Sequence, residues 1–336
     1  MDIVLNILVF AIGVFVLIKA ADFFVDAASL IARKLKISPL IIGLTIVALG
    51  TSLPEFAVSL TSALKSTTTA DLALGNVVGS NITNITLILG ISALMSPIFV
   101  QKNIIKRDLP FAILAALMLF GLAFFFQVDK RIVWWEALIF IVLLVLYVFL
   151  LIRSSKKGGS GDLDVEVEGE EKEVKPEKKF SVWTIVFLIL GGAGIALGAE
   201  LVTRPATYLA EKMATSFGLD QDMATILVGV SVVAIGTSLP ELATSVAAAR
   251  KGENGIVLGN ILGSNILNIL FILGITGLFV PLGVSDTIII DMAIMIGITL
   301  VASLLILRKK LSKVEGLILL SIFASYMAYA IIRTVM

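Results

Sequence analysis

The sequence predicts an all-α polytopic membrane protein with ten transmembrane helices, arranged as two inverted-topology repeats of five. Three observations support this: an apolar composition, ten apolar segments of spanning length, and two polar motifs that each occur once per half. Of the 336 residues, 58% are hydrophobic and 15% are charged, with a mean hydropathy of +1.07. Soluble domains carry about 25% charged residues. The composition therefore excludes a soluble enzyme, a nucleic-acid-binding protein and a disordered tail.

The predicted spans are apolar segments separated by charged residues or by proline and glycine. About 20 residues are needed to cross about 30 Å of hydrocarbon. We expect spans at residues 4–31, 40–64, 72–97, 108–128, 132–152, 181–211, 223–249, 255–280, 287–307 and 315–334. Because the N-terminus lacks the features of a cleaved signal peptide, we interpret the first segment as a true span.

Lysine and arginine residues concentrate in alternate loops of this map. One set of loops carries 19 of them and the opposite side carries five. Since the side rich in these residues faces the cytoplasm, we expect a cell-membrane protein with both termini outside and the 154–180 loop in the cytoplasm. This loop separates a first five-helix repeat, residues 1–153, from a second five-helix inverted repeat, residues 181–336.

The 154–180 loop is the only long polar linker in the sequence. It begins with glycine and serine residues and then carries eight acidic residues. This composition is typical of a solvated, disordered hinge between two halves. A low-affinity cation sensor is the alternative, although the linker has no ligand loop of defined spacing.

Two polar motifs occur in both halves. Gly43–Ser59 reads GLTIVALGTSLPEFAVS and Gly229–Ser245 reads GVSVVAIGTSLPELATS. Leu74–Ile85 reads LGNVVGSNITNI and Leu258–Ile269 reads LGNILGSNILNI. Because each half contains an odd number of spans, the halves enter the membrane in opposite senses. Inverted repeats of this kind place a transporter's substrate site near the middle of the membrane, where the repeats meet.

Glu55 and Glu241 are the charged residues of the first motif. Each is the only charged residue in its predicted span, 40–64 or 223–249. A charge at this depth costs at least about 2.5 kcal/mol, and two carboxylates that face each other also repel. A cation bound between them resolves both problems. Two neutral glutamic acids, hydrogen-bonded inside the bundle, are the alternative.

The residues around the glutamates offer further oxygen ligands. Pro54 and Pro240 disrupt the helix, so we expect backbone carbonyls just before them to turn toward an ion. The second motif adds serine and asparagine side chains. The predicted ligands besides the glutamates are Thr51, Ser52, Thr237, Ser238, Ser80, Ser264, Asn84 and Asn268, with the carbonyls of Ala48 and Ala234.

The remaining small and amide residues of the second motif have a different predicted role. Its glycines are spaced by four, which favours close helix packing. For its other asparagines, hydrogen bonding between helices is favoured over direct ligation. The glycines are Gly75, Gly79, Gly259 and Gly263, and the asparagines are Asn76, Asn81, Asn260 and Asn265.

Carboxylate, hydroxyl, amide and carbonyl oxygens suit Ca²⁺, Na⁺ or Mg²⁺. The chain has no histidine and no cysteine, so it lacks the ligands that transition metals prefer, and any transported proton must bind a carboxylate. Two glutamates supply the charge that matches one divalent ion. Ca²⁺ accepts an irregular shell of oxygens, whereas Mg²⁺ demands a tight octahedron. A site built from two mobile halves therefore favours Ca²⁺, with Na⁺ as a competitor.

In these motifs the sequence resembles the cation/calcium exchanger superfamily, and within it the prokaryotic-type sodium/calcium exchanger branch. The paired GTSLPE and GNxxGSNxxN segments look like that family's two α-repeats. The resemblance implies ten helices, a cytoplasmic central loop and alternating access, and it places the family's ligands on the residues named above. Many sodium/calcium exchangers have an aspartate where this chain has Asn268, so the resemblance leaves the coupling ion and the stoichiometry open.

We therefore expect a secondary antiporter, not an enzyme, that exchanges Ca²⁺ for Na⁺ at one site while the first and sixth helices slide against the bundle. An H⁺/Ca²⁺ antiporter, or one for another divalent cation, is the alternative, because two glutamates can take up two protons when the ion leaves. The doubled mid-membrane site argues against a passive channel or a scaffold. We expect no cofactor, no nucleic acid and no obligatory protein partner; the partners are the ions and the lipid bilayer.

Overall fold

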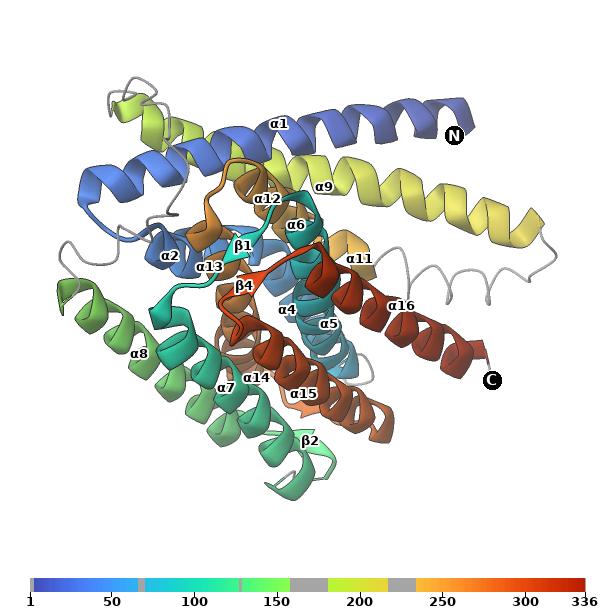
Figure 1. Ribbon diagram of the computed structural model, residues 1–336. Coiled ribbons are helices and arrows are strands. Elements are labelled where there is room, and N and C mark those ends of the chain that lie inside the picture. Colours follow the sequence, from blue (N-terminus) through green and yellow to red (C-terminus); the bar gives the residue numbers. More distant parts are fainter. Residues whose placement is uncertain (1–2, 66–69, 127–128, 158–180, 217–233, 336) are drawn as a thin grey trace.

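A computed structural model of the protein describes residues 3–65, 70–126, 129–157, 181–216 and 234–335. Two long helices, α1 (Ile3–Leu35) and α9 (Val182–Ser216), lie side by side across one face of a bundle of shorter helices (Figure 1). They run antiparallel, because Gly13 of α1 packs on Leu201 of α9, whereas Phe24, farther along α1, packs on Gly191, which comes earlier in α9.

The elements of the first half are mainly α-helices with short π-helical segments. In order after α1 they are α2 (Pro39–Ile42), η1 (Gly43–Val47), α3 (Ala48–Thr51), α4 (Leu53–Lys65), α5 (Ala70–Thr83), η2 (Asn84–Ile88), α6 (Leu89–Met95), β1 (Ile98–Phe99), η3 (Ile104–Asp108), α7 (Leu109–Gly121), η4 (Leu122–Phe126), β2 (Arg131–Ile132) and α8 (Trp134–Lys157).

The described part of the second half follows the same order, except that the π-helical segments η3 and η4 have no counterparts there. After α9 the elements are α11 (Ala234–Thr237), α12 (Leu239–Arg250), α13 (Asn254–Leu267), η6 (Asn268–Leu273), α14 (Gly274–Phe279), β3 (Leu282–Gly283), α15 (Asp286–Ile306), β4 (Lys310–Leu311) and α16 (Lys313–Val335).

Within the described residues, eight helices are long and apolar enough to cross a membrane, and the bent pair Pro39–Thr51 and Leu53–Leu64 makes up to nine. These correspond to nine of the ten expected spans. The tenth, 223–249, is described only from Ala234 onward, as α11 and α12, and its residues 223–233 lie outside the described part of the chain. The expected linker, 154–180, likewise lies outside it from residue 158 onward.

Both copies of the GTSLPE motif contain a helix break. Helix α3 ends at Thr51 and α4 begins at Leu53, with a bend of 44° between the two segments of the pair. In the second half, α11 ends at Thr237 and α12 begins at Leu239. The break follows from the proline two residues after each serine, because proline has no backbone N–H to donate and its ring clashes with the preceding turn.

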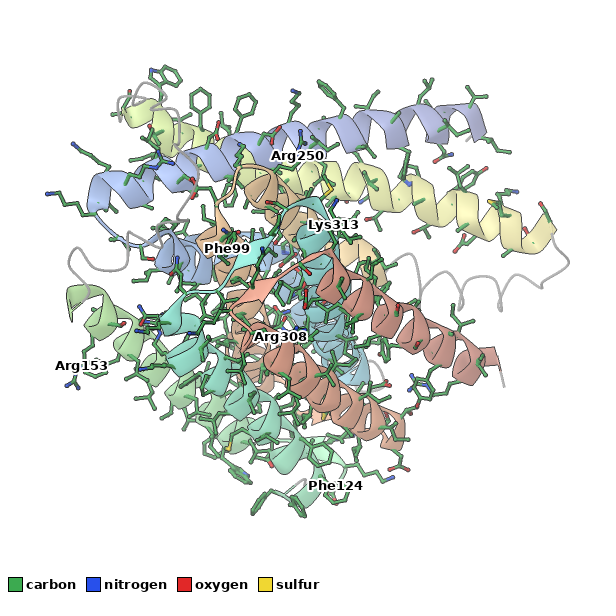
Figure 2. The ribbon with its side chains drawn as sticks, viewed as in Figure 1. Phe99, Phe124, Arg153, Arg250, Arg308 and Lys313 are labelled. Carbon is green, nitrogen blue, oxygen red and sulfur yellow. The ribbon has the colours of Figure 1, made fainter. Side chains whose placement is uncertain are left out.

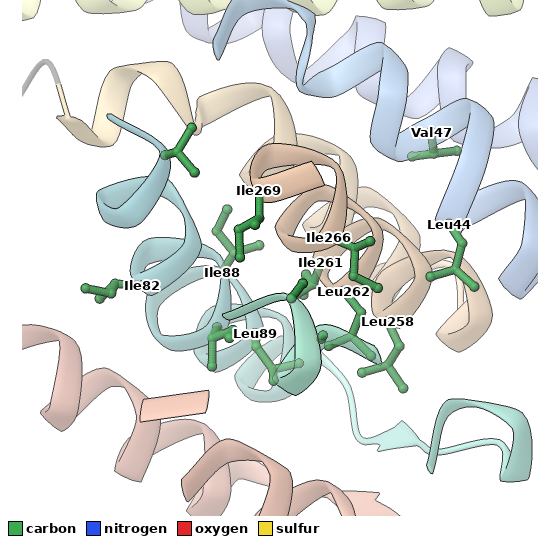
Figure 3. Close-up of a cluster of buried hydrophobic side chains, with 14 of the residues drawn as sticks. Leu44, Val47, Ile82, Ile88, Leu89, Leu258, Ile261, Leu262, Ile266 and Ile269 are labelled. Atoms are coloured by element: carbon green, nitrogen blue, oxygen red, sulfur yellow. The ribbon is translucent and has the colours of Figure 1, made fainter. Parts of the chain in front are cut away.

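The central spans are those that carry the asparagine motif. Every residue of α13 from Gly255 to Leu267 is buried. Its apolar side chains lie between Leu44 and Val47 on one side and the chain around Ile88 on the other (Figure 3). The backbone of α13 also approaches the 40–48 segment closely, because a Cβ on Gly259 would lie 2.6 Å from the carbonyl oxygen of Leu40.

Two short antiparallel ribbons join segments from different halves of the chain. Strand β1 pairs with β4, with Ile98 opposite Leu311, and Lys310 lies over the ring of Phe99. Strand β2 pairs with β3, with Ile132 opposite Leu282. Figure 2 places Phe99 and Arg308 beside the first ribbon and Phe124 toward the far end of α7. Each ribbon therefore links the two halves directly.

Candidate functional site

Glu55 and Glu241 lie in the first turns of α4 and α12, directly after the two helix breaks. Both side chains are completely buried, and their carboxylates interact electrostatically with each other. No Lys or Arg of the described residues contributes to the electrostatics of either carboxylate. The fold thus brings together two acidic groups from opposite halves without a basic side chain between them.

The four serines near the glutamates fall into two pairs. Ser52 Oγ donates a hydrogen bond to Glu241 Oε1 at 2.9 Å, and Ser264 Oγ lies 3.5 Å from the same oxygen. The hydroxyls of Ser80 and Ser238 are buried and have no partner among the described residues. Ser52 of the first half therefore donates to Glu241 of the second half, whereas Ser238 makes no equivalent bond to Glu55.

Thr51 Oγ1 lies 3.1 Å from the carbonyl oxygen of Val47, 3.3 Å from that of Ala48 and 3.0 Å from Asn260 Oδ1. A hydroxyl has one proton, so it donates to one of these acceptors at a time. The Ala48 carbonyl also accepts the backbone N–H of Ser52. In the second half, Ala234 and Thr237 are the first and last residues of α11.

Asn84 and Asn268 begin the π-helical segments η2 and η6, at matching positions of the two halves. Short π-helical segments inside α-helices frequently occur at functional sites. Asn84 Nδ2 donates to Asn265 Oδ1 at 3.0 Å, and Asn268 Nδ2 donates to Asn81 Oδ1 at 3.1 Å. Each amide nitrogen is thus engaged by the opposite half, while both Oδ1 atoms are buried without a partner.

Seven buried oxygen atoms from these residues lack a hydrogen-bond partner within the described part of the chain. They are Glu55 Oε1 and Oε2, Glu241 Oε2, Ser80 Oγ, Ser238 Oγ, Asn84 Oδ1 and Asn268 Oδ1. A buried polar atom without a partner is costly. All seven are hard oxygen ligands of the kind that bind Ca²⁺ or Na⁺, so these atoms are chemically suited to a desolvated cation.

Other buried acids in the structure have clear structural partners. Asp108 accepts bonds of 2.7 and 3.0 Å from Arg107 and one from the Tyr147 hydroxyl, and Asp291 is paired with Arg333. Glu136 Oε2 accepts a backbone N–H at the start of α8, and its Oε1 has no partner among the described residues. Burial of an acid therefore does not by itself mark an ion site in this protein; the lack of a cationic partner separates the two glutamates from Asp108 and Asp291.

The motif asparagines expected to join helices do so. Asn76 Nδ2 donates to the Glu55 carbonyl oxygen and, at 3.0 Å, to Ser59 Oγ. Asn260 makes the equivalent bonds to the Glu241 carbonyl oxygen and Ser245. The serine acceptors were not among the predicted residues, although both occupy the last position of the first motif, which is the signal that could have identified them.

The predicted close packing at the motif glycines is confirmed in the second half. A Cβ on Gly263 would lie 2.9 Å from the Cα of Leu44, within van der Waals overlap. In the first half, no atom of the described chain lies within 4 Å of a Cβ on Gly79. The segment that would correspond to 40–48 there, up to residue 233, lies outside the described residues.

A comparison with known protein families matches residues 5–153 and 183–332 to the family described as sodium/calcium exchanger protein. The match covers both halves and omits only the linker and the ends. The chain belongs to the sodium/calcium exchanger family. It is accordingly a multi-pass membrane antiporter and not an enzyme.

Individual relatives of this exchanger span nearly its whole length. CaxA of Alkalimonas amylolytica is 41% identical over 322 residues, covering 94% of this chain and 95% of that protein. The sodium/calcium exchanger MaX1 of Methanosarcina acetivorans is 32% identical, covering 97% of this chain and 98% of that protein. The solved structure of the sodium-calcium exchanger NCX_Mj matches with a TM-score of 0.76 and 31% identity, covering 97% and 99% of the two chains.

Proposed function

We propose that this exchanger transports Ca²⁺ in one direction and Na⁺ in the other by alternating access at the site between its halves. The observation that carries the proposal is the set of seven unpartnered buried oxygens on Glu55, Glu241 and the other motif residues. Two carboxylates supply the charge of one Ca²⁺, and Na⁺ competes for the same hard oxygens. Among the relatives, NCX_Mj has been studied after soaking with Na⁺, with Ca²⁺ and with Sr²⁺.

The proposed ligands combine the unpartnered oxygens with the motif residues predicted from the sequence. Ca²⁺ would bind both carboxylates together with the amide oxygens of Asn84 and Asn268. Besides the carboxylates and amides, the proposed set contains hydroxyls of Thr51, Ser52, Ser80, Thr237, Ser238 and Ser264 and carbonyls of Ala48 and Ala234. Because Ser52 and Ser264 already contact Glu241, they would exchange a hydrogen bond to the carboxylate for a bond to the ion.

We also propose ten transmembrane helices in two inverted repeats, with units at residues 1–153 and 181–336. The antiparallel packing of α1 on α9 supports an inverted relationship. The ribbons also support it. Ile98 of the first half pairs with Leu311 of the second, and the equivalent residue of the second half, Leu282, pairs in the same register with Ile132 of the first. On the charge distribution, both termini would lie outside and the 154–180 linker in the cytoplasm.

The test is Na⁺-gradient-driven uptake of ⁴⁵Ca²⁺ into vesicles that contain the purified protein. We expect uptake by the unmodified exchanger and its loss in Glu55→Gln and in Glu241→Gln, because each change removes one of two charges that bind the ion. Glu136→Gln is the matched control, since this glutamate is also completely buried but accepts a backbone N–H instead. Normal uptake by both site variants would refute the assignment.

Exchange of Ca²⁺ for H⁺ is the alternative coupling. It is favoured by one feature, the two carboxylates that would be free to take up two protons after the ion leaves. The two couplings separate when Na⁺ is replaced by choline at clamped pH. Ca²⁺ movement that persists and follows the pH gradient would replace Na⁺ by H⁺ in the proposal, whereas movement that stops without Na⁺ would support it.

A further inference from the structure

Four asparagines form a closed hydrogen-bond network across the interface of the two halves. Asn81 Nδ2 donates to the backbone carbonyl oxygen of Asn265 at 3.2 Å, and Asn265 Nδ2 donates to that of Asn81, also at 3.2 Å. The Oδ1 atoms of the same two residues accept the amide nitrogens of Asn268 and Asn84. All four side chains are buried, with 0 to 3% of each residue exposed.

The orientation of every amide in this network is determined by the backbone. A carbonyl oxygen can only accept a hydrogen bond, so the Asn81 group that faces the Asn265 carbonyl must be its NH₂. The Asn81 Oδ1 then faces Asn268 and requires a donor there. Asn268 must present its Nδ2 to Asn81, and its own Oδ1 is turned away from the network, without a partner.

The equivalent residues of the other half are oriented in the same way. Asn265 is fixed by the Asn81 carbonyl, and it requires the Nδ2 of Asn84. The segment η2 that begins at Asn84 packs against α12, which carries Glu241, and η6 packs against α4, which carries Glu55. Each half therefore orients the amide that the other half contributes.

We propose that Asn81 and Asn265 are positioning residues that hold the amide oxygens of Asn268 and Asn84 toward the transported cation. Neither acts as a ligand, because both ends of each amide are already used within the network. The inference rests on the proposed Ca²⁺ site and adds how its two amide ligands are oriented before the ion arrives. Orientation in advance strengthens binding because the ion does not have to order its own ligands.

The network predicts an unusual pattern of coupling between substitutions. Asn81 acts on Asn268, which is distant in sequence and lies in the other half, and not on Asn84, which is three residues away on the same span. Two changes that affect one contact are not additive, whereas independent changes are. A double-mutant cycle can therefore separate orientation of a ligand from a general role in helix packing.

The experiment measures the apparent Ca²⁺ affinity of exchange for Asn81→Ala, Asn268→Ala and their double variant, with Asn81→Ala/Asn84→Ala as the matched control pair. We expect each single change to weaken the affinity about tenfold, the size of a lost, well-oriented hydrogen bond or ligand contact. The Asn81/Asn268 double variant should bind no more weakly than Asn268→Ala alone. The control pair should show the product of its two single effects, about a hundredfold in all.

A second readout keeps loss of folding separate from loss of orientation. The thermal midpoint of each folded, purified variant is measured without ions and with Ca²⁺. If the two asparagines have a purely structural role, their substitution lowers the ion-free midpoint and leaves the Ca²⁺-induced increase intact, which would overturn the inference. Effects on Ca²⁺ affinity that are additive in both pairs of variants would also overturn it. If the unmodified exchanger shows no Ca²⁺ exchange, the proposed function fails and the inference with it. If it exchanges Ca²⁺ but the effects of Asn81→Ala and Asn268→Ala are additive, the inference fails and the proposed function stands.

Discussion

The hydroxyl of Ser52 donates a hydrogen bond of 2.9 Å to the Glu241 carboxylate, which lies on the other half of the chain. The counterpart of Ser52, Ser238, is buried without a partner, and both Glu55 oxygens are open. The two glutamates are therefore inequivalent, although they occupy identical hexapeptides. Glu241 accepts hydrogen bonds from the protein, whereas both Glu55 oxygens have no hydrogen-bond partner among the described residues.

This inequivalence predicts different effects for two matched substitutions. Ser52→Ala removes the close donor of Glu241, whereas Ser238→Ala removes a hydroxyl that has no partner among the described residues. We expect Ser52→Ala to lower the free energy of unfolding by about 1–3 kcal/mol in the absence of ions, and Ser238→Ala to lower it less. Chemical unfolding in ion-free detergent measures both, and an equal loss would contradict the observed asymmetry.

Binding of the transported ion should stabilise the protein. A ligand that binds only the folded state adds about 2.7 kcal/mol to the free energy of unfolding at a concentration one hundred times its dissociation constant. We therefore expect Ca²⁺ to raise the thermal midpoint and a chelator to reverse the increase. Glu55→Gln should abolish the shift, since its two oxygens are the least satisfied of the site. A shift that survives in this variant would place the ion elsewhere.

The close contact between α1 and α9 depends on glycine. A Cβ on Gly198 would lie 2.7 Å from the backbone nitrogen of Leu17, so Gly198→Ala must force the two helices apart. We expect this variant to lose both stability and transport. Gly297→Ala is the control, because within the described chain no atom lies near its added Cβ. Since alanine favours a helix by up to about 1 kcal/mol over glycine, the control should be neutral or slightly stabilising.

The proposed inverted topology can be tested with a matched pair of lysines. Lys130 and Lys309 precede β2 and β4, and both have a positive φ, 57° and 66°. Both are exposed, and their carbonyls accept equivalent bonds from Val284 and Val100. Because the chain has no cysteine, Lys130→Cys and Lys309→Cys each introduce a single thiol. A membrane-impermeant maleimide added to intact cells should label the first alone; labelling of both would refute the topology.

The sequence was sufficient to predict the helical membrane class, the helix breaks and the family. Each depends on local chemistry: apolar length, a proline in the motif, and a pair of motifs that few unrelated chains would share. Interhelical bonding by Asn76 and Asn81 could also be predicted, because an amide inside a membrane must find a partner.

The orientation of the asparagines and the inequivalence of the glutamates could not be predicted from sequence. Both depend on which atoms meet across the interface, and the two copies of each motif are nearly identical in sequence. The contact of Asp108 with Tyr147 and that of Asp291 with Arg333 were also missed, because the two residues of each contact lie on different spans. Charge spacing along the chain does not reveal such contacts.

The two ribbons also join segments that are synthesised at widely separated times. Strand β1 is synthesised long before its partner β4, and at about 5–20 residues per second it waits roughly 10–40 s for it. During that interval the second half, which supplies the hydrogen-bond acceptors for the Asn81 and Asn84 amides, is not yet complete. Because buried amides without partners are costly, we expect the first half alone to be less stable than the complete chain. A ribosome that stalls in the linker should yield a product that the cell degrades.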